Sequence, residues 1–199
     1  MPVEIPLDCV RRDGHGEVKP GRPKKINLQF IHDPASMPQE WKRNITQDLQ
    51  SATQSAFRRQ TPPQEREIMD RTFGPDVKLL ILVKHGGKIK GYYSVGTMTV
   101  QPETSNPKNV VFLHASILHK DVKGYGLMNL MQSAGILMGK EYYRIQRGRK
   151  GNPQTAHLLA ARVQKKDIAD RLQKHMGKSN LQDWYAVARH LHPEIAPTP

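Results

Sequence analysis

The strongest constraint on the fold is the stretch VVFLHASILHKDVKGYGLMNLM, residues 110–131. Its apolar first part predicts a buried strand over 110–118. An amphipathic helix is predicted after it by apolar residues at helical spacing, which are Leu127, Leu130, Met131, Ala134, Leu137 and Met138. Gly124 and Gly126 stand between the two, where glycine permits positive φ and close approach of the backbone to a ligand. The first helical turn adds unpaired amides and the positive end of the helix dipole. The stretch therefore predicts a strand, an anion-binding loop and a helix, an arrangement suited to a pyrophosphate.

The residues before this unit predict two helices and then an antiparallel hairpin. Alternating apolar and polar residues predict a short strand over 26–31. Ser36 resembles an N-cap with Gln39 as its capping-box partner. An apolar stripe follows at spacings of three and four and consists of Met37, Trp41, Ile45, Leu49, Ala52 and Ala56. The other elements expected here are a helix over 61–73, opened by Thr61, and strands over 77–83 and 88–100, joined by the turn His85-Gly86-Gly87.

The residues after the unit predict one more strand and two more helices. The strand is expected over 142–147, and the helices over 153–176 and from Ser179 onward. Residues 1–25 contain Pro, Gly and charge without periodicity, so we expect an irregular basic segment there and a single domain over 26–199. The order of elements predicts an α+β fold with an antiparallel meander in the middle.

The loop and its surroundings resemble the GNAT superfamily of acyl-CoA-dependent N-acyltransferases. In that family a strand leads into a loop of the form Arg/Gln-x-x-Gly-x-Gly/Ala, whose amides hold the CoA pyrophosphate, and here the loop is DVKGYG, residues 121–126. GNPQTAHLL, residues 151–159, is similar to the segment at the family's fifth strand whose Asn contacts the pantetheine arm. The resemblance covers about residues 26–165. It implies an α/β/α domain with a mixed, mostly antiparallel sheet flanked by helices, and the sequence adds an extra C-terminal helix.

The resemblance also implies a cofactor, which is acetyl-CoA or another acyl-CoA. Its pyrophosphate would lie on the loop amides, with Lys120 and Lys123 adding positive charge, and backbone amides at the end of the strand would pair with the pantetheine. The implied cofactor-binding residues are Ile117, Leu118, His119, Val122, Lys123, Gly124, Tyr125, Gly126, Leu127 and Asn152.

Three features depart from the family's pattern. Asp121 stands where the family has Arg or Gln, and a carboxylate near a pyrophosphate is repelled by it. Leu159 stands where the family often has a Tyr general acid, and His157 on the same turn is the candidate substitute. No sixth and seventh strands are predicted after the long helix, where the family builds part of its acceptor cleft.

The chemistry of N-acyl transfer suggests candidate catalytic residues. The reaction needs a neutral amine, a stabilised oxyanion and a proton for the leaving thiolate. Because side chains alternate along a strand, His114, Ser116 and Leu118 are expected on one face. His114 is then a candidate general base, acting directly or through water, and the alternative is a hydrogen-bonded core or edge histidine. The predicted catalytic residues are His114, Ser116 and His157.

The charge of the chain predicts an acidic partner. Lys and Arg number 31 against 18 Asp and Glu, a formal net charge of +13, so the protein attracts polyanions. The densest basic segment is KEYYRIQRGRK, residues 140–150, where tyrosines lie among cations as on nucleic-acid surfaces. The alternative is an ordinary solvated face. The candidate nucleic-acid residues are Lys140, Arg144, Arg147, Arg149 and Lys150.

Other classes of protein are disfavoured. With Cys9 as its single cysteine, the chain has no internal disulfide framework or cysteine-based zinc cluster. No apolar run approaches the ~20 residues of a membrane span, and the first residues lack the apolar core of a signal peptide. The pair His190 and His192 has only Glu194 nearby as a carboxylate, so no metal site is predicted. We therefore expect a soluble cytoplasmic protein with no membrane partner.

Two functions follow from these patterns. The first is acyl-CoA-dependent N-acyl transfer, with acetyl-CoA as donor and an amine on an acidic or nucleic-acid-associated molecule as acceptor. The alternative is a nucleic-acid-binding protein on a GNAT-like scaffold without catalysis. Only the first predicts that CoA stabilises the folded protein.

Overall fold

A single six-stranded sheet organises the molecule, with strand order β1-β2-β3-β4-β5-β6. A computed structural model describes residues 2–11, 15, 17–20, 23–58, 60–100, 108–150 and 158–161. Neighbouring strands from β1 to β5 are antiparallel, whereas β6 runs parallel to β5. The strands are β1 Val3–Cys9, β2 Lys24–His32, β3 Val77–His85, β4 Lys88–Val100, β5 Lys108–Leu118 and β6 Leu158–Ala161.

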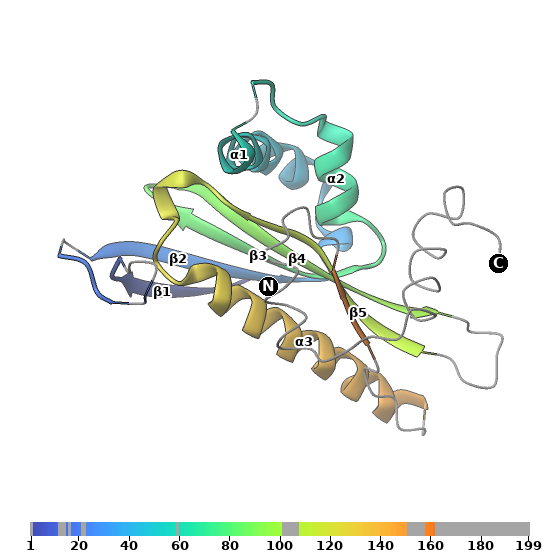
Figure 1. Cartoon of the computed structure of the whole chain (residues 1–199). Helices are drawn as coiled ribbons and strands as arrows, with labels where there is room; N and C mark the ends of the chain where they lie inside the picture. The colour runs from blue at the N-terminus through green and yellow to red at the C-terminus, as the bar shows by residue number, and fades with distance from the viewer. Residues whose placement is uncertain are drawn as a thin grey trace, which may run out of the picture.

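Helices cover both faces of the sheet (Figure 1). Helices α1 and α2 pack on one face, which we call the α1/α2 face, and α3 packs on the other, the α3 face. This arrangement confirms the predicted α+β class and the fold that the GNAT resemblance implies. The helices are α1 Gln39–Phe57, α2 Glu65–Phe73 and α3 Leu127–Lys150, with short 3-10 turns η1 Pro34–Ser36 and η2 Lys120–Val122.

Each face has its own hydrophobic core. On the α1/α2 face, Leu49 and Ala52 of the predicted apolar stripe are buried against Leu80 and Leu82 of β3. On the α3 face, Leu127 and Met131 are buried in a core that includes strand residues from β2 to β5. The two apolar helix faces therefore fix which side of the sheet each helix covers.

The predicted starts of the first two helices are wrong, although both helices exist. Pro38 is the N-cap of α1, while the Ser36 hydroxyl donates a hydrogen bond to the Asp33 carbonyl and belongs to η1. Likewise, α2 starts after Gln64 rather than after Thr61. In both places a proline close to the start restricts the backbone before it to extended angles, so the helix begins later.

The N-terminal segment is not irregular throughout, because residues 3–9 form strand β1. It pairs with β2 from Val3 opposite Phe30 to Cys9 opposite Lys24. Leu7 and Cys9 pack against the core of the α3 face, so pairing with β2 and partial burial stabilise a strand that Pro6 and the charges obscure in the sequence. Pro6 is tolerated because β1 lies at the edge of the sheet.

Two predictions after the central unit are also wrong. Residues 142–147 are helical because α3 continues to Lys150, where Tyr143 is buried and its hydroxyl donates to the carbonyls of Met98 and Val110. Residues 158–161, expected within a long helix, form β6 beside β5. The predicted helix from Ser179 lies outside the described residues.

The buried face of α3 includes most of the predicted apolar stripe, since Leu127, Met131, Ala134 and Met138 pack in the core of the α3 face. Leu130 and Leu137 are 46% and 66% exposed, whereas Gly135 and Gly139 lie against the sheet. A Cβ atom at Gly135 would overlap Cε1 of Tyr93, so α3 can approach β4 this closely only without a side chain there. The buried face is therefore centred closer to the two glycines than the apolar stripe predicts. Among the described residues, no helix is long and apolar enough to span a bilayer.

Candidate functional site

A β-bulge in β5 places the candidate catalytic residues. Ser94 of β4 pairs with Ala115 and Val95 pairs with Leu113, so His114 is the extra residue between them. Beyond such a bulge the alternation of side chains is shifted by one position. The predicted common face of His114, Ser116 and Leu118 is therefore wrong: His114 lies on the α1/α2 face, and the other two lie on the α3 face.

His114 lies largely buried across Gly96 of β4. A Cβ atom at Gly96 would overlap Nε2 of the imidazole, and the Phe112 ring packs edge-on with its centre 4.7 Å away. Nε2 is buried and has no hydrogen-bond partner among the described residues. Burial lowers the pKa of His114 to about 4; Asp76 opposes this shift and Arg71 adds to it. The imidazole is consequently neutral at physiological pH.

Ser116 faces α3 and forms a hydrogen bond with it. Its hydroxyl donates a hydrogen bond to the sulfur of Met128, in the first turn of α3. It therefore lies across the sheet from His114 and does not form a catalytic pair with it.

On its other edge, β5 pairs with β6. Leu158–Ala161 pair in parallel with Val110–Leu113. The rest of β5 continues to Leu118 and leads directly into η2. The bulge and the glycine loop thus follow one another along a single strand.

The loop after β5 has the conformation that its glycines predict. Gly124 and Gly126 have φ of 84° and 73°, in the left-handed region that favours glycine. The helix begins at Leu127, and the Leu130 amide donates to the Gly126 carbonyl at its start. A Cβ atom at Gly126 would have no heavy atom within 4 Å, so the space outside this residue is open. The loop therefore presents its backbone to a ligand.

Two lysines hold Asp121, the residue that departs from the family's loop. The Lys90 ammonium lies 3.1 Å from the Asp121 carboxylate, and the Lys24 ammonium donates to the Asp121 carbonyl at 2.8 Å. The hydrogen bond from Lys90 lowers the pKa of Asp121, so the carboxylate is ionised and paired. Lys24 also lies 5.5 Å from the centre of the Tyr125 ring. The charge of Asp121 is therefore offset by a local cation rather than directed unopposed at the loop.

Sequence reasoning missed Lys24 and Lys90. Lys24 precedes Asp121 by 97 residues and Lys90 precedes it by 31, and no local motif marks either one. Lys90 is the extra residue of a second bulge, between the pairs Val83–Gly91 and Lys84–Ile89. Their role becomes visible only once the register of the sheet is known.

Hydrogen bonds of His119, Lys120 and Lys123 fasten the loop to its neighbours. The His119 ring accepts a hydrogen bond from the Asp121 amide, and burial is the main cause that lowers its pKa. The His119 amide donates to the Lys90 carbonyl at 2.8 Å, so its predicted role as a free backbone donor to a cofactor is wrong. The Lys120 amide donates to the Ser55 hydroxyl and the Lys123 ammonium to the Ala56 carbonyl, both at 3.3 Å.

The other predicted cofactor residues are distributed around the loop. Ile117 packs on the α1/α2 face, whereas Leu118, Val122 and Leu127 are buried in the core of the α3 face. Tyr125 is half-buried beside them. The buried side chains support the loop, and a ligand would meet its backbone and its cations. Asn152 and His157 lie outside the described residues.

The predicted nucleic-acid segment forms the last turns of α3. Lys140 is exposed, and the Arg144 guanidinium binds the Glu141 carboxylate through Nε at 2.8 Å. The side chains of Arg147, Arg149 and Lys150 lie outside the described part of the structure.

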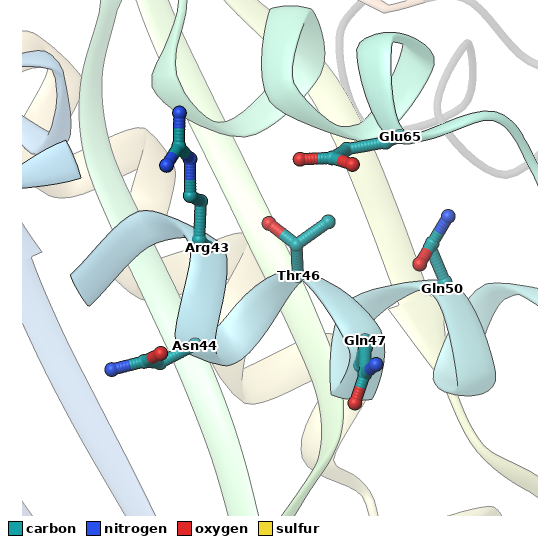
Figure 2. Close-up of a pocket in the computed structure, with 6 residues that line it drawn as sticks. All are labelled: Arg43, Asn44, Thr46, Gln47, Gln50 and Glu65. Atoms are coloured by element: carbon teal, nitrogen blue, oxygen red, sulfur yellow. The ribbon is translucent and has the colours of Figure 1, made fainter. Parts of the chain in front are cut away.

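An open hollow lies between α1 and α2, away from the loop glycines (Figure 2). Figure 2 shows Glu65 of α2 pointing toward Thr46 of α1, with Gln50 further along α1. The lining is polar, and the Gln50 amide donates a hydrogen bond to the Pro63 carbonyl. The residues that line it are Arg43, Asn44, Thr46, Gln47, Gln50 and Glu65.

Comparisons with known proteins find likeness in structure only. No protein-family model matches the sequence, and no curated protein is significantly similar to it. An aminoglycoside acetyltransferase from an uncultured soil metagenomic sample is 11% identical, with a TM-score of 0.49 over 78% of this chain and 92% of that chain. A Trypanosoma brucei acetyltransferase has the same identity and TM-score over 78% and 94%. A ribosomal-protein-alanine N-acetyltransferase from Brucella melitensis biovar Abortus 2308 is 11% identical, with a TM-score of 0.46 over 78% and 93%.

Proposed function

We propose that this protein is an acyl-CoA-dependent N-acyltransferase that uses acetyl-CoA. The observation that carries the proposal is the sequence of features along β5: a bulge at His114 and, beyond it, a positive-φ glycine loop that opens α3. Bulges redirect backbone groups beside active sites, and a helix N-terminus favours an anion. One strand thus connects a candidate reaction point to a candidate pyrophosphate site.

The loop fits the phosphates of CoA in space and in charge. The open space at Gly126 admits a phosphate against the backbone, because no other atom occupies it. Lys90 offsets Asp121, and Lys120 and Lys123 belong to the same loop. The residues that would hold the cofactor are the backbone from Lys123 to Leu127, together with these cations.

The bound acyl-CoA would supply a thioester whose acyl group is transferred to an amine. Residues of β5 would orient that group, since the disrupted ladder at the bulge leaves backbone amides to polarise a carbonyl oxygen. His114 is neutral at physiological pH, so its lone pair could accept the proton that the amine loses as it attacks the thioester, whereas its low pKa makes it too weak a base to deprotonate a free ammonium group beforehand. Ser116 holds Met128 instead of taking part in proton transfer.

Thermal unfolding with acetyl-CoA tests the proposal. A ligand at about 100 times its Kd stabilises the folded state by about 2.7 kcal/mol, which corresponds to roughly 5–10 °C in Tm for a domain of this size. We expect a rise of this order with acetyl-CoA and a smaller one with ATP, which lacks the pantetheine arm. An unchanged Tm at saturating acetyl-CoA, in a folded sample, contradicts the proposal.

A further inference from the structure

The end of the sheet that carries the glycine loop also gathers cations from several separate elements. Figure 1 shows the segment leading into α3 at the same end of the sheet as the connection between β1 and β2. Hydrogen bonds join the elements: the Lys25 carbonyl meets the His85 ring at 2.9 Å, and the Lys120 amide meets Ser55 near the end of α1. We call the following residues the basic end: Lys25 of β2, Arg58 at the C-cap of α1, Lys88 of β4 and Lys120 of η2.

Three acids near the basic end are bound to other groups, and a fourth, Asp8, lies opposite Lys25 in the register of β1 and β2. Asp48 accepts a hydrogen bond from the Ile89 amide at 2.9 Å, and Asp121 is paired with Lys90. Glu4 is paired with Lys84 at 2.7 Å. Within the described part of the chain, the side chains of the basic end make no ion pair with these acids. Their positive charge is therefore available to a partner.

The opposite end of the sheet carries charges of both signs. Asp33, the N-cap of η1, lies 3.5 Å from the Lys78 ammonium of β3, so its carboxylate is already paired.

An exposed aromatic ring lies within the basic end. Phe57 is 36% exposed and directly precedes Arg58, and Lys123 binds the carbonyl of the preceding Ala56. Aromatic rings among cations are the platforms on which unpaired bases stack. A membrane surface would need a broad apolar helix face here, and on α1 Phe57 is the exposed large apolar side chain.

We propose that the basic end binds single-stranded nucleic acid. Lys25, Arg58 and Lys88 contact successive phosphates, and Phe57 stacks on a base. These cations lie outside the residues assigned to CoA, so the proposal goes beyond acyl transfer and does not depend on it. Lys120 lies where the two sites adjoin.

Fluorescence anisotropy with a labelled oligodeoxythymidine of about 20 nucleotides tests the proposal, because this probe exceeds the length that a small binding fold occupies. The test variant is Arg58→Glu/Lys88→Glu, and the charge-matched control is Lys140→Glu/Arg144→Glu on α3. We expect the affinity of the test variant to fall at least ~10-fold. Its slope of log K against log salt should become shallower by about 1.4, which is about 0.7 for each of the two phosphates that it no longer neutralises. The control is expected to bind within about threefold of wild type.

A separate substitution tests the stacking interaction. Phe57→Ala removes one ring and no charge, so affinity should fall about fivefold or more while the salt slope is unchanged. Equal reductions in affinity for the test variant and the control, or a reduction confined to the control, would overturn the assignment of this surface. So would tighter binding to phosphatidylserine vesicles than to the oligonucleotide with the same dependence on Arg58 and Lys88.

CoA titration of the same variants separates this proposal from the proposed enzyme. Arg58→Glu/Lys88→Glu should bind CoA as wild type does, since neither residue belongs to the loop. Loss of oligonucleotide binding with CoA binding intact supports the surface, whatever the outcome of acyl-transfer assays. Wild-type oligonucleotide affinity in the folded test variant overturns it.

Discussion

The two faces of β5 carry different parts of the candidate site, and the residues of each part are brought into place in different ways. On the α3 face, Ser116 and Leu118 lead through a short turn to the glycine loop and α3, and neighbouring residues in the sequence build the whole unit. On the α1/α2 face, His114 lies over Gly96 and near Asp76 and Arg71, which come from distant segments. The candidate cofactor loop is therefore formed by residues that are neighbours in the sequence, whereas the position of the candidate catalytic residue His114 depends on the register between strands.

The largest predicted effect tests how closely α3 approaches the sheet. Gly135→Ala places a Cβ atom in steric overlap with Cε1 of Tyr93, whose ring is fully buried. Overpacking of this kind should lower the free energy of unfolding by about 1–3 kcal/mol. Urea unfolding measures it, with exposed Asn129→Ala on the same helix as the control. Unchanged stability of Gly135→Ala would show that α3 does not approach β4 so closely.

The next effect tests the other face through His114. The unfolded chain takes up this proton near pH 6.5, whereas the folded chain takes it up only near pH 4. Acidification through this window therefore favours the unfolded state, and the histidine's contribution falls by up to about 1.4 kcal/mol per pH unit. Urea unfolding of wild type and His114→Gln at several pH values should show a steeper acid loss in wild type. Parallel curves would mean that His114 is not buried as a neutral ring.

A smaller effect tests whether Lys90 masks Asp121. Lys90→Met leaves the carboxylate unpaired beside the loop and should weaken CoA binding by about 5- to 10-fold, or ~1 kcal/mol. Asp121→Asn in the same background should restore most of the affinity, because the repelling charge is then gone. Calorimetric titration of CoA into wild type, the two single variants and the double variant measures the coupling between Lys90 and Asp121. Additive effects of the two substitutions would exclude a coupling between these residues.

The smallest effect concerns Ser116. Since its hydroxyl is bound to Met128 on the face away from His114, Ser116→Ala should change the acyl-transfer rate by less than about threefold, or under ~0.7 kcal/mol. His114→Gln serves as the comparison and should lower the rate by about 100-fold, the low end for removal of a general base. A larger reduction for Ser116→Ala than for His114→Gln would reverse the roles assigned to the two faces.

Local patterns predicted most of the fold and the loop. The hairpin from Val77 to Val100, the strand before the loop and the positive φ of Gly124 and Gly126 all follow from nearby residues. Chain periodicity also identified the buried stripe of α1 that includes Leu49. These features depend on contacts within one element or between adjacent ones, which a single sequence displays.

Features set by distant pairing could not be predicted. The bulge that turns His114 to the α1/α2 face arises from the pairing of β5 with β4, and strict alternation in the sequence gives no sign of it. Lys24 and Lys90 reach Asp121 only because the sheet brings their strand ends together. In α3, the buried side is marked by Gly135, a residue that an apolar pattern does not count.

Titration of CoA into wild type, Gly126→Glu and Gly87→Glu tests whether the glycine loop holds the cofactor. Both glycines have positive φ and open space around them, so the two substitutions impose similar strain and the same charge, one in the loop and one at the hairpin turn. We predict that wild type binds CoA, that Gly87→Glu binds within about threefold, and that Gly126→Glu shows no binding while its circular dichroism is unchanged. Binding of CoA to Gly126→Glu with wild-type affinity, or no binding to wild type, would show that the loop is not a cofactor site.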